Sequence, residues 1–182
     1  MTKKETTKIF GKELSTQITF VGLAGAGKTT LVKQLKGEKE IQTSYVPTMG
    51  MNVETLKLGD LEVIAADMGG QKSFLDSFWK PFVTKSDGVV FVFDSADTKS
   101  RELAAEYLQK VIDWTSKNAA LLFLANKIDL EEAASLETII DDLKLSEVIA
   151  NRPHSFGVYQ TSALRGDNVW EAWNWLAEKV AK

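Results

Sequence analysis

The fold is decided by FVGLAGAGKTT, the stretch at residues 20–30. It reads as the end of an apolar strand, a glycine-rich turn and the first turn of a helix, and it fits the phosphate-loop pattern G-x-x-x-x-G-K-[ST] without a gap. Small residues let successive backbone N–H groups curl around a phosphate, and the helix that follows adds its positive N-terminal end. The pattern predicts a nucleotide phosphate site formed by Gly22, Leu23, Ala24, Gly25, Ala26, Gly27, Lys28, Thr29 and Thr30.

Side chains in and after this loop predict a metal site beside the phosphates. The Lys28 ammonium should reach the outer phosphates, and the Thr29 hydroxyl should ligate a Mg²⁺ ion that bridges two of them. Asp67 ends an apolar run, where a phosphate-loop enzyme needs a carboxylate for the metal; an ordinary turn residue is the alternative. Gly70 lets its N–H approach a terminal phosphate, and the neutral side chain of Gln71 suits the orientation of an attacking water.

The segment NKID at 126–129 is typical of base recognition. The Asp129 carboxylate can accept hydrogen bonds from guanine N1–H and from the 2-amino group. Adenine offers neither donor and would leave the carboxylate unpaired, so such a site discriminates strongly. The Lys127 stem can cover the face of the base, and Asn126 can tie neighbouring loops together. N-K-x-D is a short and common string, but after the fifth strand of a phosphate-loop chain it predicts guanine specificity.

The composition indicates one compact domain. With 182 residues, of which 44% are hydrophobic and 26% charged, the chain can bury one sizeable core. A net charge of −3 and a pI of about 5.3 argue against a nucleic-acid partner. No apolar run approaches the roughly 20 residues of a membrane span. The absence of cysteine excludes disulfides, thiolate metal sites and thiol catalysis, and it is compatible with a cytoplasmic location. We expect a monomer.

The first fifteen residues differ from the rest of the chain. They carry four lysines and few sizeable apolar residues, so we expect a weakly amphipathic or disordered segment at 1–15 and a single domain at 16–182. The alternative is a short segment that docks on the domain or on a membrane surface. Thr2 stands where N-myristoylation needs glycine, and the absence of cysteine removes prenylation and palmitoylation. We therefore expect a cytoplasmic protein, with a peripheral membrane location as the alternative.

Apolar strands alternate with amphipathic helices along the remaining chain. Gly59 and Asp60 are typical of a two-residue hairpin turn, so the second and third strands should pair antiparallel. Pro81 should break a helical region that carries Trp79 and Phe82. The alternation predicts an α/β fold with a six-stranded, mostly parallel sheet, antiparallel at strand two, and helices on both faces. We expect strands at 17–23, 53–58, 61–67, 88–94, 119–125 and 155–159, helices at 28–37, 100–116, 135–144 and 168–181, and a long loop at 38–52.

The last expected helix separates its tryptophans between two faces. Val169, Trp173, Leu176 and Val180 share one face and should enter the core. Trp175 should point away from it, as an ordinary surface aromatic or as a contact for a partner.

Five motifs together resemble those of small GTPases of the Ras superfamily, in particular its Arf/Sar/Arl branch. The resemblance runs over nearly the whole chain and implies a phosphate-loop G domain that binds GTP or GDP with Mg²⁺. The motifs are GLAGAGKTT at 22–30, PTMGMN at 47–52, DMGGQ at 67–71, NKID at 126–129 and TSA at 161–163.

The resemblance also implies roles for single residues. Thr48 would close over the Mg²⁺ and the γ-phosphate, which makes it a metal ligand with Thr29 and Asp67 and a catalytic residue with Lys28 and Gln71. Ser162 and Ala163 would belong to the guanine pocket, where the Ala163 N–H meets the guanine carbonyl.

The resemblance implies a molecular switch with membrane-trafficking-type signalling. The segments around Thr48 and at 70–82 would be ordered by the γ-phosphate and released after hydrolysis, so that the GTP form recruits effector proteins. An exchange factor and a GTPase-activating protein would be its other partners. Ala24 stands where the family commonly has aspartate, close to the expected γ-phosphate, so we expect slower hydrolysis than in its relatives.

Slow hydrolysis also follows from the arginines. This class of reaction gains greatly from an arginine finger, but the chain has only Arg101, Arg152 and Arg165, and none lies in 38–48. Two other functions stay open at this point. A constitutively GTP-bound interaction subunit is favoured by Ala24 and opposed by Gln71. A phosphate-loop kinase of a small molecule would need a lid and would not need N-K-x-D.

Overall fold

The computed structural model describes residues 16–37, 51–58, 61–68, 77, 79–151 and 155–180, and at 51–58 and 61–68 this description concerns the backbone. The N-terminal segment at 1–15 and the three expected site residues Thr48, Gly70 and Gln71 lie outside the described residues.

Six strands form one sheet in the order β2-β3-β1-β4-β5-β6. β2 pairs antiparallel with β3, and the pairs β3–β1, β1–β4, β4–β5 and β5–β6 are all parallel. The predicted α/β fold with a mostly parallel sheet is confirmed. The strands are β1 (Thr16–Val21), β2 (Met51–Leu58), β3 (Leu61–Met68), β4 (Gly88–Asp94), β5 (Ala120–Asn126) and β6 (Phe156–Thr161).

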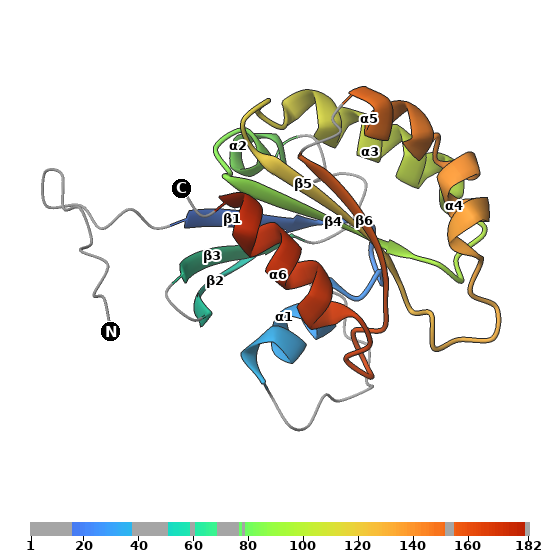
Figure 1. The fold of residues 1–182 in the computed structure, drawn as a ribbon, viewed down its shortest axis with the longest axis horizontal. Coiled ribbons are helices and arrows are strands. Elements are labelled where there is room, and N and C mark those ends of the chain that lie inside the picture. Colours follow the sequence, from blue (N-terminus) through green and yellow to red (C-terminus); the bar gives the residue numbers. More distant parts are fainter. Residues whose placement is uncertain are drawn as a thin grey trace, which may run out of the picture.

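Helices cover both faces of this sheet (Figure 1). α1 and α6 lie on one face, and α2, α3, α4 and α5 lie on the other. The helices are α1 (Lys28–Lys36), α2 (Lys80–Val83), α3 (Arg101–Trp114), α4 (Leu136–Asp142), α5 (Leu145–Asn151) and α6 (Val169–Val180).

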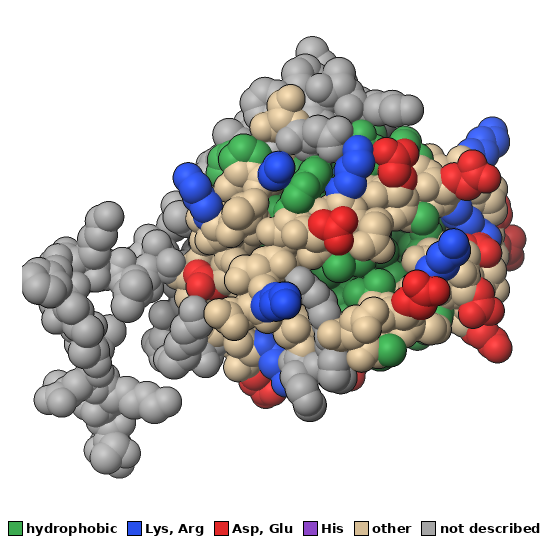
Figure 2. All heavy atoms as spheres, turned by 90° about the horizontal axis from the view of Figure 1, so that it is seen from above, with side chains coloured by type: hydrophobic (Ala, Val, Ile, Leu, Met, Phe, Trp, Pro, Cys, Tyr) green, Lys and Arg blue, Asp and Glu red, His purple; other side chains and the backbone are tan. Residues whose placement is uncertain are grey.

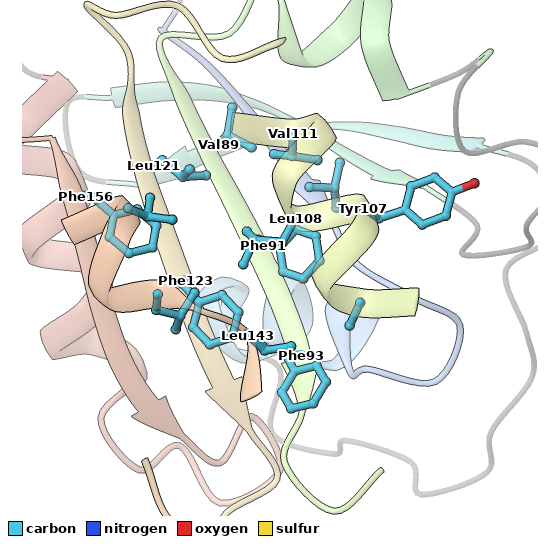
Figure 3. Packing of buried hydrophobic residues seen from close by; sticks show 14 of the residues in the cluster. Val89, Phe91, Phe93, Tyr107, Leu108, Val111, Leu121, Phe123, Leu143 and Phe156 are labelled. Atoms are coloured by element: carbon cyan, nitrogen blue, oxygen red, sulfur yellow. The ribbon is translucent and has the colours of Figure 1, made fainter. Parts of the chain in front are cut away.

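The neighbouring inner strands β4 and β5 are buried nearly throughout, and their side chains alternate between two separate cores. On the α3 side, Phe91 stacks on Phe123 with ring centroids 5.9 Å apart, among the aromatic and aliphatic residues in Figure 3. On the opposite face, Val92 and Leu124 pack against α1 and α6. Burial on both faces explains why the sequences of these strands are continuous apolar runs. It also holds the carboxyl ends of the strands in fixed positions.

Two expected helix boundaries are wrong. The helix expected at 135–144 ends at Asp142, and α5 begins separately at Leu145, where Leu145 and Val148 enter the core. Lys144, between the two helices, has a left-handed φ of 54°, which a continuous helix does not allow. Pro81 does not break a helix: it lies in the first turn of α2, where the missing N–H is not needed.

Trp175 does not point freely outward as expected. Its indole packs over the outermost strand β6, where its ring centroid lies 6.3 Å from that of Tyr159. A Cβ added at Gly157 would come within 2.8 Å of the same indole, so glycine is required beneath it. The exposed tryptophan of α6 is Trp170, with 46% of its surface accessible.

The surface of the described residues carries both signs of charge. On the face seen in Figure 2, lysine and arginine side chains lie interspersed with aspartate and glutamate, with apolar patches between them. None of the helices in the described part of the chain is long and apolar enough to cross a lipid bilayer.

A buried pair of hydroxyl groups joins β1 to the turn that follows α2. The oxygens of Thr19 and Ser86 lie 2.6 Å apart, and Ser86 Oγ lies 2.9 Å from the carbonyl oxygen of Phe82, to which it donates. Because the Ser86 proton is used in that bond, Thr19 is the donor in the other. The two hydroxyls are therefore not equivalent.

This asymmetry predicts different costs for the two nearly isosteric deletions. Thr19→Val should cost about 1 kcal/mol of unfolding free energy, because Ser86 still donates to Phe82. Ser86→Ala should cost about 2 kcal/mol, because it leaves the wholly buried Thr19 hydroxyl without a partner. Urea denaturation of both variants measures the difference, and equal costs would contradict the assignment of donors.

Candidate functional site

The phosphate loop occupies the gap between β1 and α1, and its glycines are required by close contacts. Gly22 has φ 147° and Gly27 has φ 99°, both in the region that favours glycine. A Cβ at Gly22 would lie 2.1 Å from the carbonyl oxygen of Val92, and one at Gly27 would lie 2.3 Å from the Nδ2 of Asn126. The loop therefore packs directly on β4 and on the end of β5.

Lys28 holds the two ends of this loop together. Its Nζ donates to the carbonyl oxygens of Gly22 at 2.8 Å and of Leu23 at 3.0 Å, and only 6% of the residue is accessible. A buried ammonium beside a turn of small residues produces the positive, preorganised environment that phosphate oxygens prefer. The structure thus places the Lys28 ammonium inside the turn, beside the carbonyls of Gly22 and Leu23.

Asn126 connects the phosphate loop to the loop that follows β6. Its Nδ2 donates to the Ala26 carbonyl at 2.8 Å. Its Oδ1 accepts from the Ala163 backbone N–H at 2.9 Å and from the Thr161 hydroxyl at 3.2 Å. The Ala163 N–H, expected to meet the guanine carbonyl, is therefore already bonded to protein, and a bond to the base would have to share or replace that contact.

Asp129 lies in the loop that follows β5 and is bonded to the loop that follows β6. Ser162 Oγ donates to Asp129 Oδ1 at 2.6 Å, and Ser162 Oγ in turn accepts from the Arg165 backbone N–H at 3.1 Å. A carboxylate has about four acceptor positions, so this bond leaves about three, enough for two further donors. The structure brings Ser162 and Asp129, two of the expected site residues, into direct contact.

Lys127 stands between these residues and the end of β4. Its backbone is left-handed, with φ 68°, and its Nζ lies 2.6 Å from Asp94 Oδ2. Sequence reasoning did not single out Asp94. Its position could have identified it as a site residue, because Asp94 is the polar last residue of a buried strand. It therefore lies at the edge of the sheet where the other motifs also lie.

Nearby Asp97 shows the local electrostatics. Partial burial raises the pKa of its carboxyl, but hydrogen bonds from Ser100 and Lys99 and the Lys127 ammonium lower it, and the net effect is a pKa below the usual range. Asp97 thus stays ionised at the start of α3, where a negative charge is favourable.

The expected metal side of the site is described in part. Thr29 lies in the first turn of α1, exposed to solvent. Asp67 is in register with Phe20, which brings the backbone of β3 alongside the strand that leads into the phosphate loop. A hydroxyl and a carboxylate oxygen are ligands that Mg²⁺ accepts, so the chemical types of Thr29 and Asp67 fit the ion. The third expected ligand, Thr48, lies outside the described residues.

The three bonds of Asn126 predict a large loss of stability on truncation. Asn126→Ala would leave the Ala26 carbonyl, the Ala163 N–H and the Thr161 hydroxyl without this partner in a buried place, and should cost about 2–4 kcal/mol. Asn118→Ala, the same change at an exposed position, should stay within about 0.5 kcal/mol. Urea denaturation of the nucleotide-free proteins tests this, and equal effects would show that the contacts of Asn126 contribute little.

Comparisons with known proteins identify the family of this chain. Residues 2–180 match the ADP-ribosylation factor (Arf) family. ADP-ribosylation factor-like protein 2 of Drosophila melanogaster is 36% identical over 176 residues, which are 96% of this chain and 92% of that protein. The structure of the Arl6 BBS3 small GTPase from Trypanosoma brucei with bound nucleotide analogue GppNp is similar with a TM-score of 0.79 and 28% identity, and the match covers 92% of this chain and 98% of that one.

The match to the family extends over nearly the whole chain, and it includes each of the five motifs. The resemblance proposed from those motifs is confirmed, and the kinase and the constitutively bound subunit are not favoured. The chain belongs to the ADP-ribosylation factor family of small GTPases, and it is a GTP-binding molecular switch.

Proposed function

We propose that this chain binds GTP or GDP together with Mg²⁺ at the carboxyl edge of its sheet and hydrolyses GTP slowly, within a single G domain at 16–182. The observation that carries the proposal is the bonding of Asn126, which joins the phosphate loop to the loop after β6, where Ala163 and Ser162 lie. Ser162 in turn bonds to Asp129 in the loop after β5. The two halves of a nucleotide site, one for phosphates and one for a base, are thereby held at a fixed separation.

The phosphates would lie over the loop at 22–30. Its backbone N–H groups and the Lys28 ammonium would take the negative charge, and the start of α1 adds the positive end of the helix dipole. Thr29, Asp67 and Thr48 would hold the Mg²⁺, and the bound ion would neutralise charge on the phosphate oxygens. The Gly70 N–H is assigned to the terminal phosphate.

The base would be read by the loops after β5 and β6. Asp129 would accept from guanine N1–H and the 2-amino group, while Ser162 fixes its carboxylate from the other side. Lys127 would cover one face of the base with its aliphatic stem. Adenine would leave the Asp129 carboxylate without its donors, so guanine would be strongly preferred.

Slow hydrolysis is supported by the positions of the arginines. Arg101, at the start of α3, forms an ion pair with Asp142 of α4. Arg165 donates to the Asp129 carbonyl at 3.4 Å, on the base side of the site. Arg152 lies outside the described residues, and no arginine occurs in 38–48. With Gln71 left to orient the attacking water, rapid turnover would need an arginine from an activating protein.

As a switch, this protein would bind different partner proteins in its GTP and GDP forms. The segments around Thr48 and at 70–82 would change order with the γ-phosphate, and effector proteins would bind the GTP form. Exchange would require a further protein partner, because a nucleotide held by both loops should leave slowly. We propose a monomeric, cytoplasmic protein.

Base recognition can be tested by altering one donor–acceptor match. Asp129→Asn should weaken GDP binding by about a thousandfold or more, because the asparagine NH₂ group would face an N–H donor of guanine where the carboxylate offers an acceptor. It should bind xanthosine diphosphate better than GDP, because xanthine carries a carbonyl where guanine has its amino group. Competition against fluorescent mant-GDP and mant-XDP measures both affinities, and an unchanged preference for guanine would refute the assigned role of Asp129.

Slow turnover can be tested on the isolated chain. In a single-turnover assay with preloaded GTP and Mg²⁺, we expect a rate constant on the order of 10⁻⁴ to 10⁻³ per second, similar to a small GTPase without its activator. Gln71→Leu should lower it further, since leucine cannot orient water. Hydrolysis at one turnover per second by the chain alone would overturn the proposal that an arginine must come from a partner.

A further inference from the structure

The ion pair between Asp94 and Lys127 joins the base-recognition turn to the end of the central strand β4. The carboxylate and the ammonium approach to 2.6 Å, with 20% of the Asp94 side chain and 32% of the Lys127 side chain accessible. Asp94 is in register with Asn126, the residue before Lys127. The pair therefore bridges two neighbouring parallel strands just where both end.

The carboxylate of Asp94 is held in place by contacts other than Lys127. Its Oδ1 accepts from the Ala96 backbone N–H at 3.0 Å, which closes a tight turn after β4. The next residue, Ser95, donates its N–H to the Asn126 carbonyl at 2.9 Å. Backbone contacts thus fix the Asp94 carboxylate, and the carboxylate in turn fixes the long side chain of Lys127.

Lys127 has a backbone conformation that needs support. A left-handed φ of 68° is uncommon for lysine and persists only where the surroundings hold it. Two turn contacts contribute: Ile128 N–H donates to the Thr161 carbonyl at 3.2 Å, and Leu130 N–H donates to the Lys127 carbonyl at 3.1 Å. This conformation directs the side chain of Lys127 across to Asp94, within the segment assigned to the base.

We propose that Asp94 is a positioning residue for guanine binding, which fixes the Lys127 ammonium so that the aliphatic stem is ready to cover the base. The inference rests on the proposed guanine site. Lysine loses much rotamer freedom when it is ordered, and an anchor that orders it beforehand removes that cost from nucleotide binding. A partly exposed ion pair adds little to fold stability by itself, so the effect should appear in nucleotide release.

Neighbouring Asp97 provides a matched control. Its carboxylate accepts from the backbone N–H groups of Lys99 at 3.0 Å and Ser100 at 3.1 Å, so it serves the start of α3. It carries the same charge near Lys127, whereas the direct contact with the ammonium comes from Asp94. Comparison of Asp94→Asn with Asp97→Asn separates that contact from general electrostatics.

The test measures release of mant-GDP from the full chain by stopped flow, with excess unlabelled GDP. Asp94→Asn should raise the dissociation rate about tenfold, and Lys127→Met, which keeps the stem but loses the anchor, should do the same. The double variant should be no faster than either single one, because Asp94 acts through Lys127. Asp97→Asn should stay within about twofold of the wild type, and Asp94→Glu should recover part of the loss.

A second readout excludes a merely structural role. The single-turnover hydrolysis rate of preloaded GTP should stay within about twofold in Asp94→Asn, because the base side of the site does not touch the reacting phosphate. The role is refuted if Asp94→Asn releases mant-GDP at the wild-type rate, if its effect multiplies with that of Lys127→Met, or if release and hydrolysis change together. Failure of the wild type to bind mant-GDP would instead refute the guanine site on which the inference rests.

Discussion

The side chain of Asn126 makes the contacts on which the rest of the site depends. Its amide donates to the phosphate loop through Ala26 and accepts from the loop after β6 through Ala163 and Thr161. Asparagine is suited to this place because one planar group offers both donor and acceptor. With only 1% of the residue accessible, each of these bonds is protected from water. Two loops separated by more than a hundred residues thereby become one rigid surface.

Close packing around this amide explains the glycines of the phosphate loop. Gly27 lies directly against the Asn126 amide, and Gly22 lies against the backbone of Val92, so neither position has room for a Cβ. Lys28 then closes the loop from inside by bonding to the carbonyls at its start. The shape of the loop is thus fixed by contacts within the protein, and preorganisation of this kind strengthens an anion site. The ion pair of Asp94 with Lys127 similarly fixes the segment proposed to bind the base.

Sequence patterns predicted best those parts that depend on local chemistry. β4 was expected at 88–94 and runs over Gly88–Asp94, because a strand buried on both faces must be continuously apolar. The same reasoning missed the break between α4 and α5, since the left-handed turn at Lys144 has no glycine to mark it. The expectation that Trp175 points outward was also wrong. Helical periodicity shows on which face of the helix a residue lies, but it does not show that β6 lies beside that face.

By itself the sequence determined the fold class, the family and the chemical kinds of group at the site, because phosphate, metal and guanine each require particular residue types at short spacings. Only the tertiary structure decided which of these groups touch. The bonds of Asn126 to Ala26 and Ala163, the engagement of the Ala163 N–H by protein, and the anchoring of Lys127 by Asp94 all join segments that are distant along the chain. Such contacts follow from strand order and register, which depend on the packing of the whole sheet and which no local spacing encodes.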